Sequence, residues 1–88
     1  MIAFIYYPLR ERLTADLLRD LMRQDWPDAL ISELSDKLID EHPLPLFSCQ
    51  LPDSQLTAFS TWLQERHGML SVLLQTDSGN SQWLGRKL

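Results

Sequence analysis

The apolar residues of this chain follow two patterns that alternate along it, and this alternation constrains the fold more than any other feature. A continuous apolar run covers residues 2–7, and mainly apolar segments cover residues 44–50 and 70–75. Leucine-rich segments with apolar residues three and four positions apart lie between them. A short run rich in β-branched and aromatic residues is typical of a buried strand, and a stripe at helical spacing is typical of an amphipathic helix.

These patterns predict three helices and four strands. Thr14 is a candidate N-cap for the first helix, Pro27 for the first position of the second, and Asp53 or Ser54 for the cap of the third. Gly68 fits the end of the third helix, and a turn over residues 77–80 leads to a last strand over 81–88. We expect a single domain over residues 1–88 of α/β class, with a small α+β fold as the alternative. The predicted order is β-α-α-β-α-β-β, with a three- to four-stranded mixed sheet in the order 2-1-3-4, its first strand central.

Composition places further limits on function. The formal net charge is −4, and the segment from position 25 to position 53 contains seven acidic residues and a single lysine. This acidity argues against nucleic-acid binding, which depends on Lys and Arg. A single cysteine, an N-terminus without a basic region and the absence of a long apolar run predict a cytoplasmic protein with no membrane contact.

The motifs that usually mark catalysis are missing. No Cys or His pair has metal-site spacing, and the chain has no Gly-rich phosphate loop and no G-x-S-x-G elbow. His42 fits a solvated helix end, and Cys49 lies within an apolar run, where a buried inert thiol is expected. The sequence therefore predicts no metal, no cofactor and no enzyme.

The second predicted helix carries the most suggestive surface. Asp28, Asp36 and Asp40 recur at multiples of four, so a helix would align them in one acidic stripe beside Glu33. Two tryptophans, Trp26 and Trp83, are candidate anchors for a partner because tryptophan is enriched at binding hot spots. We therefore predict that these six residues bind a protein partner with a basic surface.

The favoured function is a protein-binding module, such as an inhibitor, immunity protein, antitoxin or adaptor. The element order and acidic second helix resemble those of barstar-type nuclease inhibitors at the level of fold alone. Three alternatives stay open. The chain could be a structural subunit or a homo-oligomer that pairs through its last strand, a small thioredoxin-like enzyme using Cys49, or a nucleic-acid-associated protein if Arg10, Arg12, Arg86 and Lys87 converge.

Overall fold

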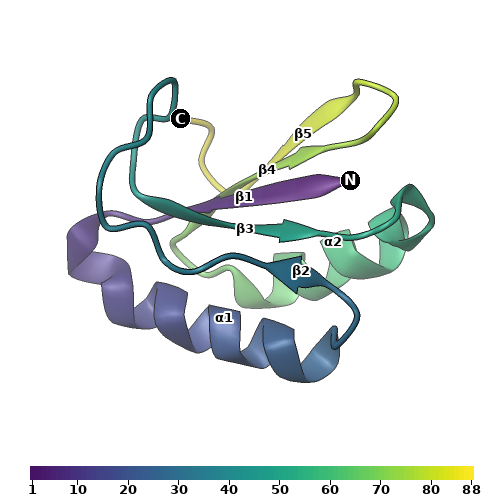
Figure 1. Ribbon diagram of the computed structural model, residues 1–88, viewed down its shortest axis with the longest axis horizontal. Coiled ribbons are helices and arrows are strands. Elements are labelled where there is room, and N and C mark those ends of the chain that lie inside the picture. The colour runs from purple at the N-terminus through teal and green to yellow at the C-terminus, as the bar shows by residue number, and fades with distance from the viewer.

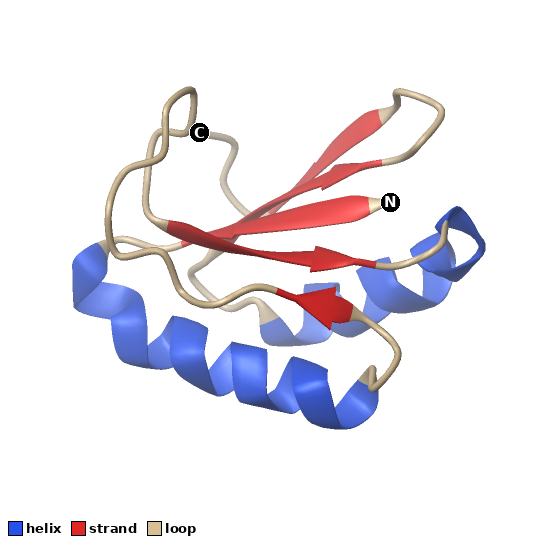
Figure 2. Ribbon diagram, in the orientation of Figure 1, coloured by secondary structure: helices blue, strands red, loops and turns tan.

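The computed structural model describes all of residues 1–88, and two helices cover one face of its five-stranded sheet (Figures 1 and 2). The helices are α1 (Arg12–Asp25) and α2 (Leu56–Arg66), and each follows a short 3-10 turn, Leu9–Glu11 and Asp53–Gln55. The strands are β1 (Ile2–Tyr6), β2 (Leu30–Ile31), β3 (Leu46–Gln50), β4 (Ser71–Gln75) and β5 (Ser81–Leu84). The opposite face of the sheet carries no helix, and we call it the open face.

The strand order is β2-β3-β1-β4-β5, and every neighbouring pair is antiparallel. Because β3 and β4 both run antiparallel to β1, they are parallel to each other, with β1 between them and α2 connecting them. In the same way α1 connects β1 and β2 across β3. Two such split β-α-β units form a ferredoxin-like α+β fold, to which the β4–β5 hairpin adds an edge strand.

The predicted fold is therefore wrong in three respects: the number of helices, the number of strands, and the expectation of a mixed sheet. The first predicted strand is central, and the four predicted strands do lie in the guessed relative order, here β3-β1-β4-β5. The error lies in the segment between α1 and β3, which supplies a fifth strand where a helix was expected. Every neighbouring strand pair is antiparallel, so the class is α+β and the sheet is not mixed.

Residues 27–43 contain no helix. Strand β2 pairs with β3, and a bridge between Ser35 and Leu46 continues this pairing further along the segment. Serine and aspartate are poor helix formers, and in a helix Asp36 and Asp40 would be like charges one turn apart. The edge of β3 offers the segment's backbone groups partners of their own, so the extended conformation is the one adopted.

The core lies between the helices and the sheet. On the sheet side it contains Ala3 and Ile5, both fully buried, and on α2 it contains Phe59, Trp62 and Leu63. The α2 residues are the stripe predicted for the third helix, and Gly68 ends that region with a φ of 56°.

Helix α1 departs from its prediction in two respects. It starts at Arg12, before the expected cap Thr14, whose hydroxyl donates to the Glu11 carboxylate at 3.0 Å. Its buried face is centred on Leu18 and Met22, while Leu17 on the neighbouring row stays 57% exposed. The leucine stripe is wider than the face that the sheet covers. Neither helix has the length and apolar character needed to cross a membrane.

Candidate functional site

The open face carries a row of apolar and aromatic side chains across three strands. Successive strand residues point to opposite faces, so Phe4 and Tyr6 lie on the open face while their neighbours on β1 face the helices. Phe4 is opposite Leu73 of β4, and Leu73 is opposite Trp83 of β5. These residues form a floor that no helix covers.

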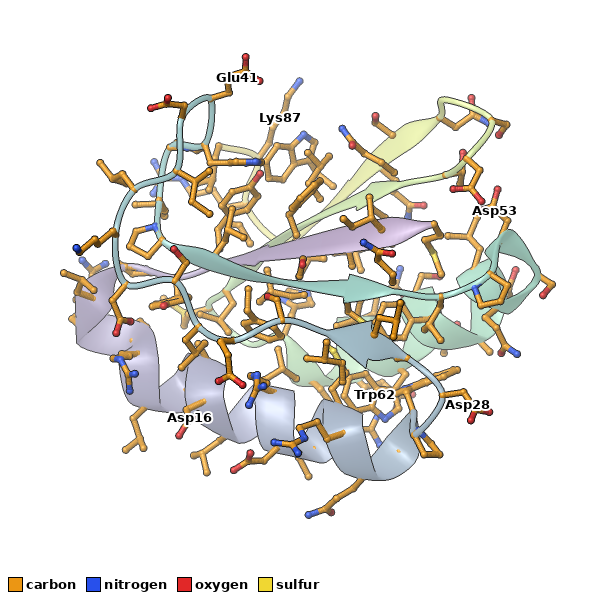
Figure 3. The ribbon with its side chains drawn as sticks, in the orientation of Figure 1. Asp16, Asp28, Glu41, Asp53, Trp62 and Lys87 are labelled. Atoms are coloured by element: carbon orange, nitrogen blue, oxygen red, sulfur yellow. The ribbon has the colours of Figure 1, made fainter.

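The long segment between β2 and β3 brings a histidine to this floor. The segment turns sharply before β3, where the His42 amide donates to the carbonyl oxygen of Ile39 at 3.0 Å. Glu41, at the tip of the turn, has a φ of 74°, a left-handed conformation that is uncommon for residues other than glycine. Figure 3 shows Glu41 at this tip, well away from the two helices. The turn directs the next side chain, His42, back over the sheet.

His42 packs into the aromatic floor and hydrogen-bonds to it. Its Nδ1 lies 2.8 Å from the Tyr6 hydroxyl oxygen. Its ring centroid lies 4.9 Å from that of Phe4 and 5.6 Å from that of Tyr6. Tyr6 in turn stacks on Trp83, with centroids 5.8 Å apart. The imidazole is therefore held in place by one polar contact and two ring contacts.

The second imidazole nitrogen of His42, Nε2, is available to a ligand, since it makes no hydrogen bond within the chain and is not buried. Burial raises the pKa of Tyr6, so its hydroxyl stays protonated at neutral pH. If Tyr6 donates to Nδ1, Nε2 carries a proton and is a donor; if Nδ1 donates to Tyr6, Nε2 is an acceptor. The pair can thus either give or take a proton at Nε2.

These groups line a hollow of about 430 Å³, a size within the range of small-molecule sites. Five of its nine lining residues are hydrophobic, and its exposed surface is about equally polar and apolar. Its lining residues are Phe4, Tyr6, Glu41, His42, Pro43, Leu73, Gln75, Trp83 and Leu88. A flat, apolar floor with a single fixed imidazole is suited to a small aromatic compound that carries a hydroxyl group.

The predicted acidic stripe does not form, because its helix is absent. Asp36 instead joins the segment to α1 and to the end of β1. It accepts a hydrogen bond from the Tyr7 hydroxyl at 2.8 Å, and its two oxygens share the Arg12 Nε–H at 2.9 and 3.0 Å. The Tyr7 hydrogen bond first, and the Arg12 contact second, hold the pKa of Asp36 below its usual value. Asp36 thus has a structural partner on each side.

The other predicted binding residues are scattered. Glu33 pairs with Arg19 at 3.2 Å, while Asp28 and Asp40 are exposed. Trp26 packs edge-on against the aromatic rings of α2, on the helix side of the sheet. Among the six predicted residues only Trp83 lines the hollow.

Sequence reasoning missed the residues at the centre of the hollow, Phe4, Tyr6 and His42. The sequence pattern places His42 at a helix end and predicts that the run 2–7 is buried on both faces. The run is apolar at every position, so it lacks the apolar/polar alternation that would mark a strand covered on one face only. Nothing in the sequence links Tyr6 to a histidine 36 positions away.

Cys49 lies on the helix side of β3 and is 1% exposed. Burial raises its pKa to about 12, so almost no thiolate forms at neutral pH. A nucleophilic or thioredoxin-like role for Cys49 has no support in this environment.

Taken together, these features define a small ferredoxin-like α+β domain with a ligand-sized aromatic hollow on its open face. The chain belongs to the Dopa 4,5-dioxygenase family, whose sequence profile matches residues 2–87.

A solved structure supports the same fold. The chain is similar to the crystal structure of a "putative dioxygenase" from Nostoc punctiforme, with a TM-score of 0.82 and 21% sequence identity. The similarity covers 99% of this chain and 82% of that one. At this identity the likeness establishes the shared fold. No curated protein sequence matches the chain.

Family membership overturns the prediction of an inhibitor or regulatory protein-binding module. The family is named for an enzyme, so it points toward an enzyme and away from the predicted lack of catalysis. The thioredoxin-like and nucleic-acid-associated alternatives fall with that prediction. Binding to a basic protein partner stays an untested prediction, and the helical acidic stripe on which it was based does not form.

Dioxygenases of the non-haem type hold iron with two histidines and one carboxylate, leaving open positions for oxygen and substrate. The residues of this chain do not fit such a centre. No three His, Cys, Asp or Glu side chains lie close enough together to hold a metal ion. The hollow contains one imidazole, and the second histidine, His67, contacts the carbonyl oxygen of Leu70 at the end of α2.

Proposed function

We propose that the chain is a small enzyme of its family that binds a phenolic compound in the open-face hollow and moves a proton at the compound's hydroxyl group through His42. The observation that carries the proposal is the His42–Tyr6 pair, joined at 2.8 Å on an aromatic floor. The family is named after dopa, a catechol, which supports the choice of substrate class.

The floor supplies the binding energy. A planar ring laid over Trp83 and Phe4 would replace water on apolar surface and gain offset-stacked or edge contacts, each worth about 0.5–1.5 kcal/mol beyond area burial. The hydroxyl group of the bound ring would then meet Nε2 of His42, which makes no hydrogen bond within the chain. Gln75, at the margin, could hydrogen-bond a second hydroxyl group, as a catechol would provide.

The pair also supplies an acid–base group whose orientation is fixed. A catalytic base is effective when a third group holds it in place, and Tyr6 holds His42 by its other nitrogen. With Nδ1–H donating to the Tyr6 oxygen, Nε2 accepts the phenol proton and the resulting imidazolium can return it. The phenolate so formed carries negative charge into its ring, where ring carbons become able to take up a proton from solvent.

Calorimetric titration tests the binding step, with catechol, phenol and cyclohexanol as probes. We expect catechol and phenol to bind and cyclohexanol, which lacks a planar ring, to bind at least tenfold more weakly. His42→Ala should raise the Kd for catechol about tenfold, which corresponds to ~1.4 kcal/mol. Leu17→Ala, on the exposed face of α1, is the matched control and should leave the Kd unchanged. Equal affinity for cyclohexanol, or an unchanged Kd in His42→Ala, would refute binding at this site.

Proton NMR in deuterium oxide tests the proton-transfer step. The chain should speed the exchange of ring hydrogens of catechol for deuterium, and His42→Ala should remove that acceleration while the protein stays folded. An exchange rate equal to that of buffer in the native chain would leave a binding protein without this catalysis.

A further inference from the structure

We infer that the open-face hollow works without a metal ion held by the chain's own side chains, in contrast to the iron centre that the family name implies. The inference concerns metal ligation alone, so it stands or falls independently of the compound that the hollow binds.

The strong donor atoms of the hollow are too few to hold a metal ion. Its one imidazole, His42, uses Nδ1 for Tyr6 and has Nε2 left for any ligand. Its one carboxylate, Glu41, is the neighbouring residue at the exposed tip of the turn. The protonated hydroxyl of Tyr6 and the amide of Gln75 are weak metal ligands.

Carbon occupies the positions from which further ligands would have to come. Phe4 is the closest ring to His42, at 4.9 Å between centroids, and Leu73 stands directly opposite Phe4 on the neighbouring strand. Opposite residues of antiparallel strands have Cβ atoms about 4.5–5.5 Å apart, a separation from which two side chains can share one metal ion. Here both positions carry apolar side chains, which offer no ligand to replace the water of a hydrated cation, so removing that water is costly.

Cobalt(II) provides the direct test, because its visible absorption reports coordination by protein ligands in solution. The native chain should show no saturable cobalt site with a Kd below about 1 mM. The double variant Phe4→His with Leu73→Glu adds a histidine and a carboxylate beside His42, which completes a two-histidine, one-carboxylate set. It should bind cobalt at least tenfold more tightly than the native chain. The variant Phe4→Leu with Leu73→Gln changes the same positions without adding strong ligands and should behave like the native chain.

Each outcome decides the inference. A native cobalt site that is lost in His42→Ala would overturn it, because the hollow would then hold metal with its present side chains. Failure of the folded double variant to bind cobalt would overturn the donor-set explanation, because the shape of the hollow would be the obstacle. Catechol titration of the same proteins reports separately on the proposed function.

Discussion

The two faces of the sheet are built from the same strands but differ in how their side chains are covered. On β1, Ala3 and Ile5 face the helices and are fully buried, while Phe4 and Tyr6 face the other side. The helix side is closed by the apolar faces of α1 and α2. The open side is closed only in part, by a turn that carries His42.

This difference indicates how stability and function are divided within one small domain. The covered face holds the buried residues that stabilise the fold, so changes there should cost folding free energy. The open face keeps aromatic carbon beside one imidazole, where a ligand could complete the burial. A one-residue shift in the register of β1 would exchange the side chains on the covered face with those on the open face. The alternation of residues along β1 therefore specifies both faces.

The largest contrast is expected in thiol reactivity along β3. Cys49 faces the helices and burial raises its pKa to about 12, so its thiolate should be far scarcer at pH 8 than that of an exposed cysteine. Ser48, opposite Phe4, faces the open side. A variant with Ser48→Cys and Cys49→Ser should react with a thiol-specific disulfide reagent at least a hundredfold faster than the native chain. Similar absorbance time courses for the two proteins would contradict the assignment of faces.

Stability should respond unequally to truncation on the two faces. Ile5→Ala leaves a cavity under the helices and should lower the free energy of unfolding by about 2–5 kcal/mol. Phe4→Ala removes a larger side chain from a partly exposed site and should cost less than Ile5→Ala. Urea denaturation measures both, and the comparison fails if Phe4→Ala proves the more destabilising change.

Removing the Tyr6 hydroxyl should separate positioning from folding. Tyr6→Phe keeps the ring stack on Trp83 and loses the hydrogen bond to His42, at a cost of about 1 kcal/mol in stability. The Kd for catechol should rise three- to tenfold, because the imidazole is no longer held. The deuterium exchange rate at saturating catechol should also fall. Unchanged affinity and exchange would mean that Tyr6 has no role beyond packing.

The smallest expected effect concerns acid stability. The pKa of Asp36 is lowered by its contacts with Tyr7 and Arg12, so its contribution is present above the unfolded pKa, near 3.8, and is lost as the pH falls through the lower folded value. Asp36→Asn should therefore be less stable than the native chain at pH 7, and the gap should narrow below about pH 4. Urea midpoints from pH 7 to pH 2.5 measure it, and a gap that widens in acid would have the wrong sign.

The sequence predicted those elements whose residue pattern is compatible with only one type of secondary structure. The stripe of Phe59, Trp62 and Leu63 could only bury itself as a helix, and Gly68 marked its end. The segment over residues 27–43 has leucines at helical spacing, but its serines and aspartates favour caps and turns. Its conformation depends on the free edge of β3, which the pattern alone does not reveal.

The hollow was less predictable than the fold. Trp83 was recognised as a candidate anchor, but His42 acquires its role only when the turn at Glu41 brings it over Tyr6. That contact joins residues from the first strand and from a loop with no regular structure. The residue pattern of one sequence describes local periodicity and carries no information about a contact between such distant residues.

The most direct test of the aromatic hollow is an NMR titration of isotope-labelled protein with catechol. Binding in the hollow predicts amide shift changes that cluster on β1, β4, β5 and the turn around His42, with the amides of α1 and α2 nearly unmoved. Changes centred on the helices, or no saturable changes at all, would contradict the assignment of the open face as the functional site.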